Sequence, residues 1–264
     1  MNEIIGKCRE LYNKSDFARE SFALSEALSY LAEWQGVEFD PIILPALTSP
    51  QRECVLEAFE KAVNGYPLQY IVGKARFYKS DFTVREGVLI PRRDSETLVE
   101  EAVKRIPQGS HFLDLCTGSG CLGISVLLER PDTTATLVDI SDTALETAEE
   151  NARVLGVLDR CRLLKFDLLS RPISELPDHT ALIMNPPYLT SLEMTKIPMN
   201  VAYEPSLALD GGEDGLIFYR LFEKHTGIML FEIGSSQAED LKKIYPKSET
   251  VYDLCRNPRV VVIS

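Results

Sequence analysis

The stretch that decides the fold runs from Phe112 to Gly123 and reads Phe-Leu-Asp-Leu-Cys-Thr-Gly-Ser-Gly-Cys-Leu-Gly. The first residues predict a strand, the glycine-rich segment predicts a sharp turn, and the following residues predict the start of a helix. Glycine lets the backbone approach a ligand closely, and a helix N-terminus offers free N–H groups to a carboxylate or phosphate. The stretch therefore predicts a strand–loop–helix unit with a ligand at its loop.

Helical and strand-like patterns alternate on both sides of this stretch. Helices are expected at 95–105, 121–129, 142–155 and 236–245, and strands at 111–115, 136–139, 181–184, 227–233 and 260–263. Such alternation predicts an α/β fold with an open, mostly parallel sheet and helices on both faces. Ligands of these sheets bind beyond the carboxyl ends of the strands, so the residues after Leu115, Val138 and Met184 should share one cleft.

The N-terminal part of the chain has a different pattern. Apolar residues recur at helical spacing over 2–64, with breaks near Pro41, Pro45 and Pro50, which predicts a small helical bundle. A β-rich segment from Phe77 to Ile90, broken at 79–81 and 85–87, predicts a hairpin. We therefore expect a helical domain over 1–72, a β-hairpin linker over 73–94 and the α/β domain over 95–264.

Composition limits the class of partner. The 264 residues include 40 acidic and 28 basic side chains, a net charge of −12, which disfavours non-specific binding to nucleic acid. A basic concentration between Lys74 and Arg93 leaves such a partner open, although solvated hairpin and linker residues explain it more simply. Neither a signal-peptide core nor a run of about 18 apolar residues occurs, so we expect a cytoplasmic protein without membrane contact.

Cysteine and histidine spacing argues against a metal. The six cysteines are scattered, without a C-x-x-C pair or a histidine at ligand spacing (Cys8, Cys54, Cys116, Cys121, Cys161 and Cys255). In a reducing compartment such cysteines are free thiols. We expect neither zinc nor disulfides, and we interpret His111, His179 and His225 as surface or capping residues.

Two cofactor classes fit the glycine loop. Gly118, Gly120 and Gly123 match the G-x-G-x-x-G pattern of dinucleotide sites, which alone is a weak signal. Asp139 lies 19 residues after Gly120, at the end of the next predicted strand, where its carboxylate can accept both hydroxyls of a ribose. Dinucleotide and S-adenosylmethionine both satisfy this arrangement.

Two further aspartates favour S-adenosylmethionine. Asp114 precedes the loop, where its carboxylate can receive the cofactor's ammonium directly or through water but repels a pyrophosphate. Asp167 and Leu168 follow the apolar segment 162–166, at a place suited to holding an adenine ring. The simpler alternative is that Asp114 caps the turn and Asp167 caps a helix.

The tetrapeptide Asn185-Pro186-Pro187-Tyr188 follows the predicted strand at 181–184 and should project into the same cleft. Successive prolines make the loop rigid. The Asn185 side-chain oxygen and the Pro186 carbonyl can accept the two N–H bonds of a planar nitrogen and orient it, while Tyr188 packs against its plane. This predicts methyl transfer to an amide or amino nitrogen; the alternative is a rigid turn with Asn185 as a cap.

Several blocks together resemble the bacterial and organellar release-factor glutamine methyltransferases. They are residues 65–73, 87–96, the glycine loop, 185–188, 203–205 and 209–216. The tetrapeptide is shared with adenine-N6 DNA methyltransferases and some RNA methyltransferases, whereas the blocks around Gln69-Tyr70 and Pro91-Arg92 are more specific. The resemblance extends over nearly the whole chain.

The resemblance implies a Rossmann-like class I methyltransferase with a seven-stranded, mostly parallel sheet, behind a helical substrate-binding domain and a linking β-hairpin. It implies that S-adenosylmethionine methylates the glutamine of the Gly-Gly-Gln motif in peptide chain release factors, giving N5-methylglutamine. The implied cofactor contacts are Cys116, Thr117, Gly118, Ser119, Gly120, Asp139, Asp167, Leu168 and Asn185. The implied substrate contacts are Asn185, Pro186, Pro187, Tyr188 and Arg92, with Asn185 and Pro186 as the catalytic pair.

Three positions depart from the family pattern. Cys116 stands where glycine is usual, and a thiol fits there without strain if the backbone has negative φ. Leu168 replaces a common aromatic, so stacking on adenine becomes a plain apolar contact. The segment 253–259 lacks the expected glycine-containing turn, which leaves the geometry of the last hairpin open.

Two other functions fit parts of the pattern. A nucleic-acid amino methyltransferase would use the same cleft, but the acidic charge and the helical N-terminal block argue against it. A non-catalytic binding protein on the same fold is the second alternative. The intact tetrapeptide beside an intact glycine loop argues against that alternative.

Overall fold

The computed structural model describes residues 2–36 and 47–264 and divides the chain into two compact units. One unit contains the described residues up to Gly73 together with Pro198–Tyr203, and the other contains Lys74–Ile197 and Glu204–Ser264. The predicted breaks at Pro41 and Pro45 lie outside the described residues. Within the described residues no helix is long and apolar enough to cross a membrane.

The first unit is a helical bundle. Its helices are α1 (Asn2–Lys14), α2 (Asp16–Ser21), α3 (Leu24–Trp34), α4 (Ser49–Val63) and α5 (Leu68–Val72). Phe59 of α4 is fully buried among apolar side chains of α1, α2 and α3. Helix α4 begins with a capping box, in which the backbone N–H of Thr48 donates to Gln51 Oε1 at 2.9 Å.

A distant segment completes this unit. Gly65 ends the α4 region with φ +94°, and a Cβ there would lie 2.5 Å from Met199 Sδ. The rings of Tyr66 and Tyr203 meet edge to face with centroids 5.1 Å apart. Residues 198–203 therefore pack with the helices although they follow the tetrapeptide in sequence, an association that the sequence did not predict.

The predicted hairpin forms, but it is shorter than expected. Strands β1 (Lys74–Phe77) and β2 (Ser80–Thr83) pair antiparallel, and the turn lies at Tyr78 and Lys79, with Tyr78 at φ +54°. The expected continuation of strand structure through residues 88–90 is wrong. These residues are irregular because the Ile90 backbone N–H donates to the Glu204 carboxylate at 2.9 Å instead of to a strand.

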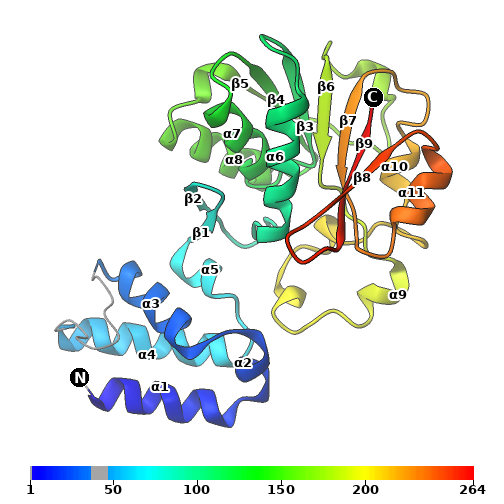
Figure 1. Ribbon diagram of the computed structural model, residues 1–264. Helices are drawn as coiled ribbons and strands as arrows, with labels where there is room; N and C mark the ends of the chain where they lie inside the picture. The colour runs from blue at the N-terminus through cyan, green and yellow to red at the C-terminus, as the bar shows by residue number, and fades with distance from the viewer. Residues whose placement is uncertain (1, 37–46) are drawn as a thin grey trace. The chain divides into compact units, whose positions relative to one another are not determined.

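The second unit is built on a seven-stranded sheet in the order β5-β4-β3-β6-β7-β9-β8 (Figure 1). The strands are β3 (His111–Leu115), β4 (Thr134–Asp139), β5 (Cys161–Lys165), β6 (Ala181–Met184), β7 (Ile228–Glu232), β8 (Glu249–Tyr252) and β9 (Pro258–Ile263). All neighbouring pairs are parallel except those made by β9. The predicted Rossmann-like α/β fold is thereby confirmed.

Alternating side chains of the strands build two cores. Phe112 and Ile183 point to a core with α6 (Glu96–Arg105), α7 (Cys121–Glu129) and α8 (Asp142–Val154), which Figure 1 shows on one face. Leu113 and Met184 point to the other core, with α10 (Ile217–Arg220) and α11 (Ala238–Ile244). The short helix α9 (Ser191–Met194) lies in the loop after β6. Helices on both faces bury the sheet, as a strand period of two requires.

The order of the strands fixes the position of the crevice. Strand β3 lies between β4 and β6, so the chain goes first to one side of β3 and then to the other. Loops that leave the carboxyl ends of β3 and its neighbours diverge there and open a crevice. The predicted shared cleft after Leu115, Val138 and Met184 falls at this place.

The last hairpin closes without glycine. Asp253 Oδ1 accepts the backbone N–H groups of Cys255 and Asn257, each at 2.9 Å. Arg256 takes the left-handed conformation, with φ +64°, that glycine would otherwise adopt. An aspartate that holds the turn explains how this segment departs from the expected glycine-containing pattern and still pairs β8 with β9.

One buried amide joins the hairpin to the glycine loop. Asn151 of α8 is 1% exposed; its Oδ1 accepts from Thr83 N at 2.7 Å and its Nδ2 donates to Thr83 O at 3.0 Å and Ser119 O at 2.9 Å. Unpaired buried backbone groups are costly. Asn151 therefore fixes β2 and the loop to the same helix.

We predict that Asn151→Ala lowers the free energy of unfolding by about 2 to 4 kcal/mol because it leaves buried backbone groups of Thr83 and Ser119 unpaired. Trp34, the single tryptophan, lies in the helical unit, so urea unfolding of the sheet unit is best followed by circular dichroism. Asn257→Ala at an exposed position is the control. Equal stability of the two variants would contradict this role.

Candidate functional site

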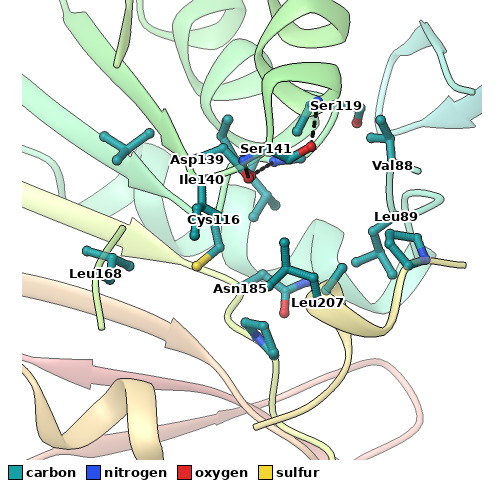
Figure 2. A pocket seen from close by; sticks show the side chains of 18 of the residues that line it. Val88, Leu89, Cys116, Ser119, Asp139, Ile140, Ser141, Leu168, Asn185 and Leu207 are labelled. Atoms are coloured by element: carbon teal, nitrogen blue, oxygen red, sulfur yellow. Dashed lines mark hydrogen bonds between the residues drawn. The ribbon is translucent and has the colours of Figure 1, made fainter. Parts of the chain in front are cut away.

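Three loops that leave the carboxyl ends of β3, β4 and β6 line one pocket (Figure 2). In Figure 2, Asp139 and Ser141 lie on one side of it, and Asn185 and Leu207 lie on the opposite side. Of the residues predicted for the site, the pocket is lined by Cys116, Thr117, Gly118, Ser119, Asp139, Asp167, Leu168, Asn185, Pro187 and Arg92. Gly120, Pro186 and Tyr188 do not line it.

Backbone hydrogen bonds shape the glycine loop before any ligand binds. The Thr117 N–H donates to Val138 O at 3.0 Å, and the Gly120 N–H donates to Thr117 O at 2.8 Å. Gly118 has φ +55°, and no other atom lies within 4 Å of where its Cβ would be. The loop therefore exposes backbone to the pocket at Gly118, and Gly120 caps helix α7 instead of lining the pocket.

Asp139 is held by the backbone around it. Its Oδ2 accepts from Gly118 N at 2.9 Å, and its Oδ1 accepts from Ser141 N at 3.0 Å. Burial raises the pKa of this carboxyl above its ordinary value, and the backbone N–H donors oppose that shift. Each carboxylate oxygen still has lone-pair capacity, so a pair of hydroxyls in the pocket can bind here.

Asp114 lies beneath the loop and not in the pocket. The side chain is fully buried, and its Oδ2 accepts from Thr117 Oγ1 at 2.6 Å and Gly123 N at 2.9 Å. Desolvation raises the pKa of Asp114 to about 7. The pocket lining does not include it, and its hydrogen bonds to Thr117 and Gly123 are those of the turn-capping alternative.

Gly123 makes that capping possible. A Cβ at this position would lie 2.7 Å from Asp114 Oδ2 and 2.6 Å from Leu137 Cδ2. No side chain fits there without moving the Asp114 carboxylate or the Leu137 side chain. The third glycine of the loop is therefore required for packing rather than for a ligand.

Cys116 corrects an expectation about its backbone. Its φ is +56°, so the negative φ that would suit a side chain is not present. The left-handed region costs an L-residue roughly 1 to 2 kcal/mol, which explains why glycine is favourable here. Burial raises the pKa of the Cys116 thiol well above its ordinary value, so the thiol is neutral.

Apolar side chains form the walls of the pocket. In Figure 2, Cys116 and Leu168 lie on one side, and Val88 and Leu89 lie on the other. Neighbouring Asp167 accepts from Leu169 N at 2.9 Å, and hydrogen bonds from Ser170 and Leu169 lower its pKa. A flat apolar ring fits between such walls, with a carboxylate at its edge.

Asn185 projects from the end of β6 into the pocket. Its Nδ2 donates to Ser95 Oγ at 3.4 Å, which directs the side-chain oxygen away from Ser95. Pro187 also lines the pocket, whereas Tyr188 does not. The Tyr188 side chain packs against the core that contains Phe231, and its carbonyl accepts from Gln237 Nε2 at 3.1 Å. Burial raises the pKa of Tyr188 to about 12, so its phenol is neutral.

Arg92 is fixed by an ion pair at the pocket rim. It pairs with Glu204, whose side chain is 1% exposed and which also accepts from Ile90 N. A buried carboxylate that accepts from both a guanidinium and a backbone N–H holds its partner in place. The pair therefore connects residues 88–92 to the segment around Pro205, which also lines the pocket.

Sequence reasoning missed several residues of this region. Val88 and Leu89 were read as strand, and Ser95 only as a helix start, yet all three line the pocket. Glu232, at the end of β7, is buried close to Ser95. Glu232, like Asp139, is the last residue of a strand of apolar residues, and this position in the sequence could have identified it as a candidate site residue.

Two of the three histidines lie against each other. His179 and His225 are half-buried and stack with ring centroids 5.0 Å apart, so the prediction that they are surface or capping residues omitted their pairing. Over residues 2–36 and 47–264, no group of three or more His, Cys, Asp or Glu side chains is placed to hold a metal ion.

Known proteins match the chain both in part and over its whole length. The Methyltransferase small domain family matches residues 93–210. A release factor glutamine methyltransferase of Moorella thermoacetica is 40% identical over 197 residues, covering 71% of this chain and 69% of that protein. A release factor glutamine methyltransferase of Thermodesulfovibrio yellowstonii is 34% identical over 280 residues, covering 98% of this chain and 97% of that protein.

A solved structure supports the fold alone. The catalytic domain of hMettl16, in complex with MAT2A 3'UTR hairpin 6, superposes with a TM-score of 0.57 at 13% sequence identity. The superposition covers 94% of each chain. At this identity the match says nothing about the substrate of the present chain.

We predict that Cys116→Gly is more stable than Cys116→Ala by about 0.5 to 1 kcal/mol. Both variants remove the thiol, and only glycine relieves the left-handed backbone. At Cys161 in β5, where φ is −109°, the order should reverse. Denaturant unfolding of the four variants measures both differences, and the same order at both sites would show that Cys116 is not strained.

Proposed function

This chain belongs to the release factor glutamine methyltransferase family, and on that premise we propose that it methylates the glutamine of the Gly-Gly-Gln motif in peptide chain release factors. The product would be N5-methylglutamine, with S-adenosylmethionine as methyl donor. One observation supports this most directly: Asn185 enters the same pocket as the glycine loop and Asp139. The acceptor nitrogen and the donor can then meet in one cavity.

The residues present fit S-adenosylmethionine. Asp139 would accept the two ribose hydroxyls, because both carboxylate oxygens retain lone pairs at the pocket wall. Leu168 and the facing apolar wall would hold the adenine, and the exposed backbone at Gly118 and Ser119 would face the amino-acid part. When bound, the sulfonium supplies an activated methyl group.

Asn185 would orient the acceptor nitrogen. An amide nitrogen is a weak nucleophile because its lone pair is delocalised into the carbonyl. If the Asn185 side-chain oxygen and the Pro186 carbonyl accept its two N–H bonds, the lone pair points toward the methyl group and positive charge developing on nitrogen is stabilised. Catalysis would be mainly alignment and electrostatics, and the methylated nitrogen would lose its extra proton after transfer.

The rigid loop keeps these acceptors in place. Pro186 and Pro187 fix their own φ angles, so little conformational entropy is lost when substrate binds. Tyr188 follows the two prolines and is a neutral phenol, and we propose that its ring supports the planar amide. Arg92, held by Glu204 at the rim, would contact the substrate near its backbone.

The proposal also assigns a separate role to each of the two units of the chain. We propose that the helical unit recognises the release factor and that the sheet unit carries out methyl transfer. The boundaries 1–72, 73–94 and 95–264 remain predictions about function, as does the cytoplasmic location. A nucleic-acid acceptor remains the competing outcome of the experiment that follows.

We expect the protein to label a release factor when it is incubated with methyl-labelled S-adenosylmethionine, and mass spectrometry should place the methyl group on the Gly-Gly-Gln glutamine. A parallel incubation with a stem-loop RNA tests the competing substrate. Asn185→Ala should lower the rate of labelling by two or more powers of ten, roughly the loss of the orienting acceptor. Label on the RNA alone, or full activity of Asn185→Ala, would refute the proposal.

Cofactor affinity gives an independent check. Asp139→Ala should raise the dissociation constant for S-adenosylmethionine by about tenfold or more, since it removes a pair of charge-assisted hydrogen bonds. Asp142→Ala at the first residue of α8 is the control, because Asp142 is exposed and pairs with Lys165. Isothermal titration that gives wild-type affinity for Asp139→Ala would rule out the ribose contact.

A further inference from the structure

Glu232 is a buried carboxyl that has no role in the methyl transfer proposed above. It ends β7, is 1% exposed, and its Oε2 has no hydrogen-bond partner among the described residues. It lies beside the pocket and does not line it. A buried acid that lacks full pairing costs stability, so its presence calls for a functional explanation.

Ser95 connects Glu232 to Asn185. Ser95 is placed so that its hydroxyl can donate to Glu232, a contact that lowers the pKa of the Glu232 carboxyl, and Ser95 Oγ accepts from Asn185 Nδ2 at 3.4 Å. Ser95 itself is 2% exposed and is fixed at its backbone, where its N–H donates to Arg92 O at 3.1 Å. The three side chains therefore form one line from the sheet interior to the pocket.

Counting protons along this line fixes the orientation of the amide. A serine hydroxyl has one hydrogen and two lone pairs. If the hydrogen points to an ionised Glu232, only lone pairs face Asn185, and Asn185 must present its NH2 group to Ser95. The side-chain oxygen of Asn185 is then left for the pocket, where an acceptor is required.

We propose that Glu232 and Ser95 are positioning residues, which hold Asn185 with its side-chain oxygen toward the acceptor nitrogen. This inference rests on the proposed function, because the orientation matters only for an acceptor that brings N–H groups. With the amide reversed, the NH2 of Asn185 would face the NH2 of the substrate, and neither could accept. A reversed amide would therefore oppose productive binding of the nitrogen.

The same arrangement predicts a dependence on pH. Burial raises the pKa of Glu232 to about 7; the Ser95 hydrogen bond, Arg259 and Arg92 oppose that shift, and Asp94 adds to it. Protonated Glu232 donates to Ser95, whose hydrogen can then turn to the Asn185 oxygen and reverse the amide. Turnover should consequently rise with pH through this pKa and level off above it.

Other titrating groups near the pocket must be separated from Glu232. Asp114 has a pKa of about 7 as well, and it lies beneath the glycine loop. Tyr219, whose hydroxyl donates to Glu232 O at 2.8 Å, and Tyr188 both have raised pKa values and stay neutral over this range. If the rise of turnover with pH is caused by Glu232, it disappears in Glu232→Gln. If it is caused by Asp114, it persists in that variant.

The test measures kcat, KM and the pH profile of release-factor methylation for Ser95→Ala, Ser95→Thr, Glu232→Gln and the Ser95→Ala/Glu232→Gln double variant. We expect kcat to fall about tenfold in Ser95→Ala and in Glu232→Gln, as for one orienting hydrogen bond, with little change in KM for S-adenosylmethionine. Ser95→Thr keeps the hydroxyl and should retain kcat within about twofold. The double variant should be no slower than either single variant.

A matched control removes a different buried hydroxyl. Ser125 of α7 is 1% exposed, its Oγ has no partner among the described residues, and it does not line the pocket, so Ser125→Ala should keep wild-type kcat. Thermal melting of each variant shows whether a lower rate reflects unfolding. Losses in kcat that add in the double variant would overturn the line of three side chains, and an acid limb in Glu232→Gln that is unchanged from that of the wild type would overturn the role of Glu232 in the pH profile.

The outcomes distinguish this inference from the function on which it rests. Wild-type protein that transfers no methyl group to a release factor overturns the proposed function, and the inference with it. Active wild-type protein with unchanged kcat in both Ser95→Ala and Glu232→Gln overturns the inference alone. A tenfold loss in both, with recovery in Ser95→Thr, supports it.

Discussion

The hydrogen bonds that two aspartate carboxylates make to the glycine loop determine the rest of the site. Asp114 holds the start of helix α7 from below through Gly123 N, and Asp139 holds the loop at the pocket wall through Gly118 N. Because these acids come from neighbouring parallel strands, the loop can form only where β3 and β4 end together. The sheet order then brings the end of β6 to the same crevice, and with it Asn185.

A pocket built in this way is organised before ligands arrive. Its walls are apolar, Asp139 and Asn185 already have hydrogen-bond partners in the protein, and the acceptor side chain comes from a loop stiffened by two prolines. This organisation also lowers the stability of the folded site. Asp114 and Glu232 are buried acids with raised pKa values, and Cys116 takes a left-handed backbone conformation. Strain and unpaired groups gather here because the surrounding sheet can hold them.

The sequence was sufficient for whatever depends on local pattern. Strand and helix periodicity gave the α/β fold and the crevice, and the spacing of Asp139 and Asn185 after strands placed them at one pocket. Contacts between residues distant in sequence could not be predicted from the sequence. The packing of residues 198–203 with the helical unit, the Glu204 bond that keeps 88–90 irregular, and the line from Glu232 to Asn185 all join residues distant in sequence. The positive φ of Cys116 is set by the geometry of the loop, which cannot be predicted from the residue pattern.

The most direct measurement is a crystal structure of the protein with S-adenosylhomocysteine and a peptide containing Gly-Gly-Gln. We predict the glutamine side-chain nitrogen about 2.7 to 3.2 Å from Asn185 Oδ1, beside the cofactor sulfur. A glutamine bound outside this pocket, or an Asn185 that turns its NH2 toward the substrate, would contradict it.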